Sequence, residues 1–200
     1  MDNSKGIKII LLGESGVGKT NLINITAGKD FNPNSASSLA SSFIESYYES
    51  ENKKYLFCLW DTAGQERFRA LNKIFIKGTK IVMVVFAINS KHSFEQIGYW
   101  ISYTKEVLGD EKYILALVAN KSDLYEEQVI PDNDIINFAK EHNIKYTITS
   151  ALSDAAGFRL FVNELVADYI KLIGPEAEEK LYFVLKPTGN KDNNKKKKFC

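Results

Sequence analysis

The chain has 200 residues, of which 44% are hydrophobic and 26% are charged, and its formal net charge is +1. This length predicts a single domain with a sizeable core, and the near-zero charge argues against a general nucleic-acid binder. The only two cysteines, Cys58 and Cys200, exclude a disulfide framework and favour a reducing compartment such as the cytosol. The longest apolar run, residues 81–88, is far shorter than the ~18 residues of a membrane-spanning helix.

Short apolar runs rich in β-branched residues alternate along the chain with longer amphipathic stretches. The apolar runs predict strands at residues 7–12, 43–50, 55–60, 81–88, 113–119 and 145–149. The amphipathic stretches predict helices at residues 21–27, 94–108, 132–141 and 156–173. The turn at residues 51–53 joins the second and third strands into an antiparallel hairpin. This order predicts an α/β fold with a six-stranded, mostly parallel sheet, one antiparallel hairpin strand, and helices on both faces.

The composition changes at Gly174-Pro175, which predicts a folded domain at residues 1–174 and a flexible tail at 175–200. The tail carries an apolar patch at residues 181–185, which docks either on the body or on a partner. Its last ten residues hold five lysines and one aspartate. This basic segment is expected to contact an anionic surface.

Residues 13–20 (Gly-Glu-Ser-Gly-Val-Gly-Lys-Thr) match the phosphate-binding pattern G-x-x-x-x-G-K-[ST] between a predicted strand and a predicted helix. Backbone N–H groups of such a loop wrap a triphosphate, and the helix dipole points toward it. Lys19 supplies a cation for the β and γ phosphates, and the Thr20 hydroxyl is a ligand for Mg²⁺. The fold is therefore predicted to be a P-loop NTPase. The remaining nucleotide contacts of this region are assigned to Ser15, Gly16, Val17, Gly18 and Asn21.

A second motif, residues 120–123 (Asn-Lys-Ser-Asp), directly follows a predicted strand. Asp123 selects the base, because a carboxylate only accepts hydrogen bonds and can take two N–H groups at once. Guanine presents N1–H and its 2-amino group on one edge, whereas adenine would leave the carboxylate without hydrogen-bond donors. The segment from Ser150 follows the last predicted strand, where a backbone N–H can meet the base carbonyl. We therefore predict guanine, bound by Asn120, Lys121, Asp123, Ser150 and Ala151.

A third motif, residues 61–66 (Asp-Thr-Ala-Gly-Gln-Glu), follows the strand predicted at residues 55–60. Asp61 suits Mg²⁺, either directly or through water. Gly64 allows a backbone N–H to approach a γ-phosphate, and Gln65 can orient an attacking water. The motif predicts hydrolysis, with Gln65 and Lys19 as the catalytic residues.

The three motifs together resemble those of small GTPases of the Ras superfamily, and most closely those of the Rab family. The resemblance covers residues 6–172; the Rab assignment depends on residues 60–69 (Trp-Asp-Thr-Ala-Gly-Gln-Glu-Arg-Phe-Arg). It implies a switch that binds and hydrolyses GTP and regulates vesicle and membrane trafficking. It further implies that Phe31 stacks on guanine, with switch I at residues 32–42 and switch II at 62–76.

The resemblance also implies partners. Effectors are expected at the switch loops and at the aromatic triad of the Rab family, here Phe43, Trp60 and Phe75. An exchange factor is expected too. A GTPase-activating protein is expected to supply a catalytic arginine, because no arginine of this chain is an obvious candidate for that role. No nucleic acid is expected, and the protein is expected to be a monomer.

Several positions depart from the family pattern. Ser38 stands where the family has a switch I threonine, with Ser37 as an alternative register, and serine keeps the Mg²⁺-binding hydroxyl but loses the β-branch that stiffens χ1. We therefore predict a looser GTP-bound switch I. Leu152 replaces a lysine near the base, so apolar packing is expected there. Ser15, common among Rab proteins, indicates slow but intact hydrolysis.

Cys200 is the candidate lipidation site, with the lysines at 195–198 as a polybasic helper. The resemblance implies prenylation, and hence a protein that is anchored at the cytosolic side of intracellular membranes and cycles with the cytosol. The prenylation box has its cysteine four residues from the end, whereas Cys200 is the last residue. A solvated, inert tail is the alternative.

Two other functions remain open on the sequence. One is a guanine-nucleotide-dependent binding module with negligible turnover, which the serine-rich switch I favours and Gln65 opposes. The other is a P-loop kinase that uses ATP, which Asp123 opposes.

Overall fold

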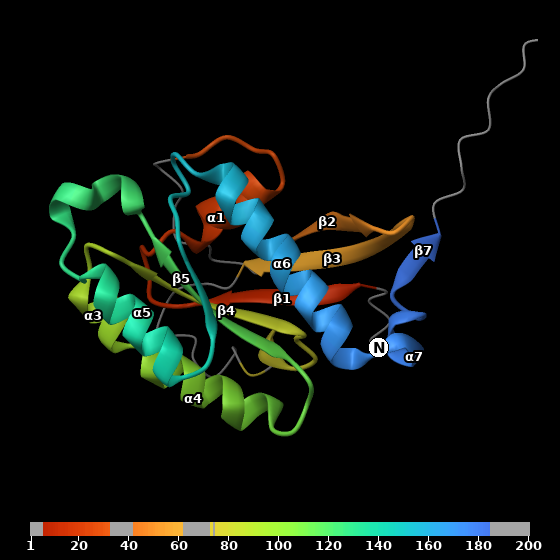
Figure 1. Ribbon diagram of the computed structural model, residues 1–200. Helices are drawn as coiled ribbons and strands as arrows, with labels where there is room; N and C mark the ends of the chain where they lie inside the picture. Colours follow the sequence, from red (N-terminus) through yellow and green to blue (C-terminus); the bar gives the residue numbers. More distant parts are fainter. Residues whose placement is uncertain (1–5, 33–41, 62–72, 74, 185–200) are drawn as a thin grey trace, which may run out of the picture.

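The computed structural model describes residues 6–32, 42–61, 73 and 75–184 (Figure 1). The strands are β1 (Ile7–Leu12), β2 (Ser42–Ser50), β3 (Lys53–Asp61), β4 (Ile81–Ala87), β5 (Ile114–Asn120), β6 (Lys145–Ile148) and β7 (Tyr182–Val184). The helices are α1 (Lys19–Thr26), α3 (Lys91–Glu95), α4 (Ile97–Leu108), α5 (Asp132–Glu141), α6 (Ala155–Ile173) and α7 (Pro175–Glu178), and a 3₁₀ helix covers Ser122–Glu127. The six predicted strands all form, each within two residues of its predicted bounds.

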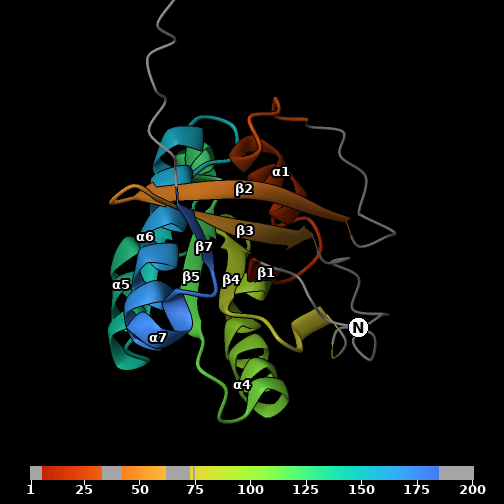
Figure 2. The same ribbon diagram turned by 90° about the vertical axis from the view of Figure 1, so that its right-hand side faces the viewer.

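The sheet has the order β2-β3-β1-β4-β5-β6, in which β2 is antiparallel to β3 and the strands from β3 to β6 are parallel. Helices α1 and α6 cover one face, and α3, α4 and α5 cover the other (Figures 1 and 2). Successive side chains of β1 point to opposite faces of the sheet, so that Ile9 packs on the α1/α6 side and Ile10 on the α4/α5 side. Helices can therefore cover both faces. The α/β fold with helices on both faces is confirmed.

The helix predicted at residues 94–108 is two helices, α3 and α4. Ser90 accepts a hydrogen bond from the backbone N–H of Ser93 at 3.3 Å and caps α3, so the helical structure begins at Lys91. Gln96 then separates α3 from α4. Of the helices that the structure describes, none has the length and apolar character needed to cross a bilayer.

A seventh strand, β7, pairs antiparallel with β3 at residues 53–55. β2 covers one edge of β3 along its whole length, whereas β1 covers the other edge only from Phe57 onward. The remaining length of that edge is open, and β7 fills it. The apolar patch of the tail therefore docks on the body of the protein, at least over residues 181–184.

Helix α7 and strand β7 lie at the end of the sheet beyond the last turn of α6 (Figure 1). Glu178 accepts hydrogen bonds from Lys53 Nζ, at 2.7 Å, and from the Tyr55 hydroxyl. The ring of Tyr182 packs edge-on against Tyr55, with centroids 5.8 Å apart, and Lys53 Nζ lies 4.7 Å from the Tyr182 ring. Part of the predicted tail, residues 175–184, forms α7 and β7 and is fastened to β3. The division of the chain into a folded domain and a flexible tail stays a prediction. Residues 185–200 lie outside the described part of the chain.

Candidate nucleotide-binding site

Two glycines shape the loop between β1 and α1. Gly13 has φ +143°, and a Cβ there would lie 2.1 Å from the carbonyl oxygen of Val85. Gly18 has φ +97°, and a Cβ there would lie 2.3 Å from Asn120 Nδ2. Both positions need glycine, because the loop backbone approaches β4 and the end of β5 too closely for a side chain. The predicted phosphate loop thus lies at the carboxyl ends of the central strands, where ligands bind in open α/β sheets.

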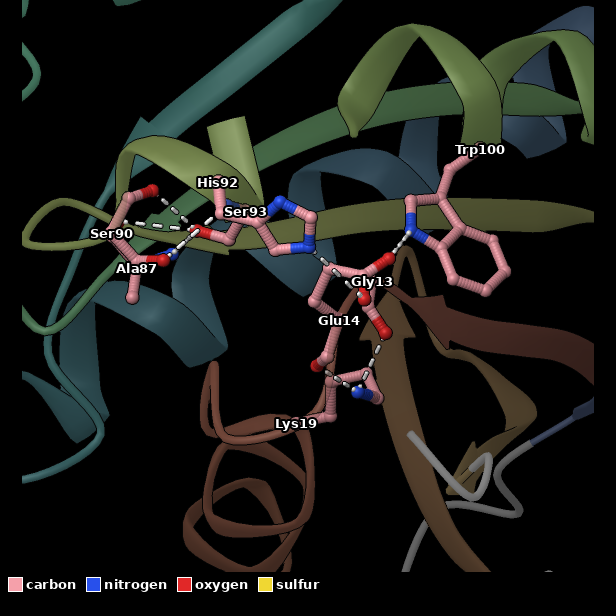
Figure 3. Close-up of polar contacts among 8 residues, drawn as sticks. All are labelled: Gly13, Glu14, Lys19, Ala87, Ser90, His92, Ser93 and Trp100. Atoms are coloured by element: carbon pink, nitrogen blue, oxygen red, sulfur yellow. Dashed lines mark hydrogen bonds and ion pairs between the residues drawn. The ribbon is translucent and has the colours of Figure 1, made fainter. Parts of the chain in front are cut away.

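Lys19 is buried, with 5% of its surface exposed, and its Nζ donates hydrogen bonds to the carbonyl oxygens of Gly13 at 2.9 Å and Glu14 at 2.7 Å (Figure 3). Burial lowers the pKa of Lys19 to about 8, and the charges of Asp61 and Glu14 only partly oppose this shift. The surrounding protein therefore does not fully compensate the buried ammonium. An anion beside Lys19 would complete that compensation, so the loop fits a phosphate group.

Thr20 and Asp61 meet at the predicted metal site. Thr20 Oγ1 donates a hydrogen bond to Asp61 Oδ2 at 2.9 Å, and Asp61 is 2% exposed. In the described parts of the chain no cluster of three or more His, Cys, Asp or Glu side chains could hold a metal. One hydroxyl and one carboxylate fit Mg²⁺, which uses few protein ligands and takes substrate phosphates and waters for the rest. When bound there, Mg²⁺ neutralises phosphate charge.

Asn120 connects three loops. Its Nδ2 donates to the carbonyl oxygen of Val17 at 2.7 Å, and its Oδ1 accepts from the backbone N–H of Ala151 at 3.1 Å. It is 1% exposed, so both hydrogen bonds are shielded from water. The phosphate loop, the end of β5 and the loop after β6 are therefore held together by one side chain.

Ser150 orients Asp123. The buried Ser150 hydroxyl donates to Asp123 Oδ1 and accepts from the backbone N–H groups of Leu152 at 3.0 Å and Ser153 at 3.1 Å. The hydroxyl thereby places the carboxylate relative to the loop after β6. Leu152 itself is exposed.

The remaining predicted contacts of the base lie around the same loops. Asn21 Nδ2 donates to the Asn32 carbonyl oxygen at 3.1 Å, and the Asn32 N–H donates to Asn21 Oδ1 at 3.3 Å, which fastens the chain just after Phe31 to α1. Phe31 is partly buried and packs against the α1/α6 side of the core. Lys121 has φ +68° and turns the chain from β5 into the 3₁₀ helix.

Some of these roles were missed by the sequence reasoning. The pairing of Asn21 with Asn32 and the orientation of Asp123 by Ser150 join residues that no local pattern connects. A third missed contact had a signal: Glu14 is an acid within a loop that must hold phosphates, and its carboxylate contacts Trp100.

Four predicted site residues, Ser38, Gly64, Gln65 and Cys200, lie outside the described residues, as does most of both switch segments. For these residues the assigned roles stay predictions. The predicted effector triad is described. Phe43 and Trp60 stack with centroids 5.0 Å apart, Phe43 is 51% exposed, and Phe75 packs partly buried on the α4/α5 side.

Comparison with known proteins agrees with the motifs. The sequence model of the Ras family matches residues 8–171. Ras-related protein Rab-21 of Geodia cydonium is 34% identical over 156 residues, which cover 78% of this chain and 68% of the relative. GTP-binding protein ypt3 of Schizosaccharomyces pombe is 31% identical over 172 residues, 86% of this chain and 79% of the relative. Ras-related protein rab-11.1 of Caenorhabditis elegans is 31% identical over 162 residues, 81% of this chain and 76% of the relative. The chain therefore belongs to the Ras family, as a Rab-like small GTPase.

Proposed function

We propose that the protein is a molecular switch that binds guanine nucleotide with Mg²⁺, hydrolyses GTP, and regulates vesicle trafficking through GTP-dependent effectors. The single observation that carries this proposal is the position of Asn120. Its amide joins Val17 in the phosphate loop to Ala151 in the loop after β6. The part that holds phosphates and the part that selects the base are thereby one hydrogen-bonded unit.

Guanine is selected by Asp123. Its carboxylate accepts the N1–H and 2-amino hydrogens of the base, and Ser150 supports it in that orientation. Adenine lacks this pair of donors and leaves the carboxylate desolvated without compensation. This contact opposes an ATP-dependent kinase.

Hydrolysis is assigned to Gln65, which orients a water for in-line attack on the γ-phosphorus. The bond between that phosphorus and the β,γ-bridging oxygen breaks, and the products are GDP and inorganic phosphate. Lys19 would offset the negative charge on the phosphates, and Thr20, Asp61 and Ser38 would hold Mg²⁺. The Gly64 N–H is assigned to the γ-phosphate, where it would couple the presence of this group to switch II.

Effector binding is assigned to Phe43, Trp60 and Phe75 and to the switch loops. Exposed aromatic side chains are typical anchors of protein interfaces, and the exposed Phe43 stacks on Trp60. An exchange factor and an arginine-supplying activating protein complete the cycle.

Membrane attachment is assigned to a lipid on Cys200, helped by the neighbouring lysines. Because β7 fastens the chain at Val184, the 16 residues from there to Cys200 limit the reach of the lipid to about 58 Å. The lipid anchors the GTPase at the cytosolic side of intracellular membranes.

Single-turnover hydrolysis of bound GTP tests the proposal. The wild-type protein should release phosphate slowly, and Gln65→Leu should release it at least about tenfold more slowly while binding GTP equally well. Equal, negligible rates in both proteins would favour the binding module instead. ATP that displaces GDP at similar concentration would favour the kinase.

A further inference from the structure

The phosphate loop contains a carboxylate, Glu14, whose side chain is only 12% exposed. A negative charge in a loop that receives a polyphosphate repels the ligand, because like charges at short distance disfavour each other. Glu14 therefore needs a compensating environment.

Two side chains from the neighbouring helices face the Glu14 carboxylate (Figure 3). Its Oε1 accepts a hydrogen bond from Trp100 Nε1, in α4, at 3.2 Å. Its Oε2 lies 3.9 Å from His92 Nε2, in α3. The Glu14 carbonyl oxygen accepts from Lys19 Nζ at 2.7 Å, so the same residue contacts both helices and the phosphate-binding lysine.

The framework behind these contacts is fixed. The Trp100 ring is 5% exposed and belongs to the α4/α5 side of the core. The start of α3 is fastened to the end of β4, because the buried Ser93 hydroxyl accepts from the backbone N–H of Ala87 at 3.1 Å and donates to the Ser90 carbonyl oxygen at 2.8 Å. The His92 side chain is 70% exposed on this anchored turn, so solvent protons reach it directly.

We propose that Glu14 is a positioning residue of the phosphate loop and that protonation of His92 controls how strongly this loop holds its nucleotide. The proposal rests on the nucleotide site proposed above. With an imidazolium beside it, the Glu14 charge is balanced and the loop holds the polyphosphate more firmly. With a neutral imidazole, the uncompensated carboxylate weakens that hold. Nucleotide release therefore accelerates when His92 loses its proton.

The other charged groups near His92 lie on α3 itself and in the phosphate loop. On its own helix, Lys91 and Glu95 face each other at 3.8 Å, and their opposite charges are largely exposed to solvent. From the phosphate loop, Glu14 and Lys19 are the charged groups in this cluster, and α4 contributes the uncharged Trp100.

The chain also supplies an internal control. His142 is the only other histidine, and its ring packs against Phe138 of α5 with centroids 4.3 Å apart. His142 makes no contact with the site among those that the structure describes.

The Trp100 indole N–H reports the Glu14 contact without any enzymatic turnover. In ¹H–¹⁵N spectra of the full-length protein with GDP, the Trp100 signal, identified by its loss in Trp100→Phe, should shift with a single inflection as the pH is changed. The inflection should disappear in His92→Gln and persist in His142→Gln. A Trp100 signal that is insensitive to pH, or an inflection that survives in His92→Gln, would overturn the role of His92.

Release of a fluorescent GDP analogue measures the consequence. Release from the wild-type protein should be about threefold faster at pH 8 than at pH 6, and His92→Gln should remove this difference while His142→Gln keeps it. The comparison between these variants also subtracts the titration of the nucleotide itself. If release from wild-type and His92→Gln changes equally with pH, the inference is wrong.

Variants of the other two residues separate charge from position. Glu14→Gln keeps an acceptor for Trp100 but removes the charge, so release should become about threefold slower at pH 8 and independent of His92. Trp100→Phe keeps the charge but frees the side chain, so release should accelerate at both pH values. Faster release from Glu14→Gln would contradict the inference. A protein that binds no GDP at all would instead contradict the proposed function.

Discussion

At the carboxyl ends of β1, β3 and β5 the polar side chains are almost completely buried, whereas at the opposite end of the sheet the residues that hold β7 are partly exposed. Asn120 and Asp61 are 1% and 2% exposed, while the side chains of Lys53 and Glu178 are 32% and 17% exposed. Removal of a hydrogen-bond partner costs the most free energy when the remaining polar group is buried, because water cannot replace the lost partner. The nucleotide end should therefore tolerate changes poorly, and the β7 end should behave as an adjustable contact.

The largest effect is expected at Asn120. Asn120→Ala leaves the Val17 carbonyl and the Ala151 N–H without their partner in a buried place, at a cost of about 1–3 kcal/mol for each group. The affinity for GDP, measured by titration calorimetry, should fall at least about 100-fold. Asn89→Ala is the control, since the hydrogen bond described for Asn89 joins it to the exposed Glu127 side chain, at 3.2 Å, and not to the phosphate loop. A nearly unchanged affinity for GDP in Asn120→Ala would contradict the expectation that the nucleotide end of the sheet tolerates changes poorly.

The next effect is expected at Thr20. Thr20→Val keeps the shape of the side chain but removes the hydroxyl that faces Asp61. The Mg²⁺ concentration that half-maximally slows GDP release should rise at least about tenfold, because even the loss of a group that only supports a metal ligand weakens metal binding by that much. Thr26→Val, at the other end of α1, removes a hydroxyl that binds only the Leu22 carbonyl and should leave this Mg²⁺ dependence unchanged. An equal response of both variants would contradict the metal assignment.

Ser150 should affect selectivity more than affinity for phosphate. Ser150→Ala removes the hydroxyl that orients Asp123, so the preference for GDP over ADP in a competition assay should fall about tenfold. Ser153→Ala keeps the backbone N–H that donates to the Ser150 hydroxyl, so it should retain the preference for GDP over ADP. The orienting role is wrong if the preference survives in Ser150→Ala.

The smallest effect is expected at the β7 end. Glu178→Gln removes the charge that pairs with Lys53, so backbone amides of residues 182–184 should exchange with deuterium about two to five times faster. Glu176→Gln, on the exposed side of the same helix, should leave that exchange unchanged.

The β7 contact should also weaken in acid. Hydrogen bonds from Lys53, and then from Tyr55, lower the pKa of Glu178. A carboxyl whose pKa is lowered by folding stabilises the folded state above its unfolded pKa, and this contribution is lost as pH falls through the folded pKa. Exchange at residues 182–184, corrected for its intrinsic pH dependence, should therefore accelerate from pH 7 toward pH 4 in wild type but not in Glu178→Gln. An equal acceleration in both would locate the acid sensitivity elsewhere.

The two ends also differ in how far the sequence predicts them. An apolar run predicted β1, the acidic residue after Pro131 predicted the start of α5, and the glycine and lysine spacing predicted the phosphate loop, because these signals are local. The contacts of Asn120 and Ser150 join loops that are distant along the chain, so the sequence predicted their presence in the site but not the atoms that they bind.

Strand β7 was predictable only as an apolar patch. Its partner is the length of β3 that β1 leaves uncovered, and this open edge exists only once the register of both strands is known. Glu14 was a related omission. An acid in a phosphate loop was a signal in the sequence, but the motif treats its position as variable. The identity of its partners follows only from the positions of Trp100 and His92.

The central claim is that the buried end of the sheet forms one site for guanine nucleotide with Mg²⁺. The most direct test measures the dissociation constants of GDP and ADP on the purified, nucleotide-stripped full-length protein with Mg²⁺ present. A site that hydrogen-bonds the guanine edge through Asp123 should prefer GDP on the order of 10⁴-fold. Comparable affinities for GDP and ADP would contradict the account.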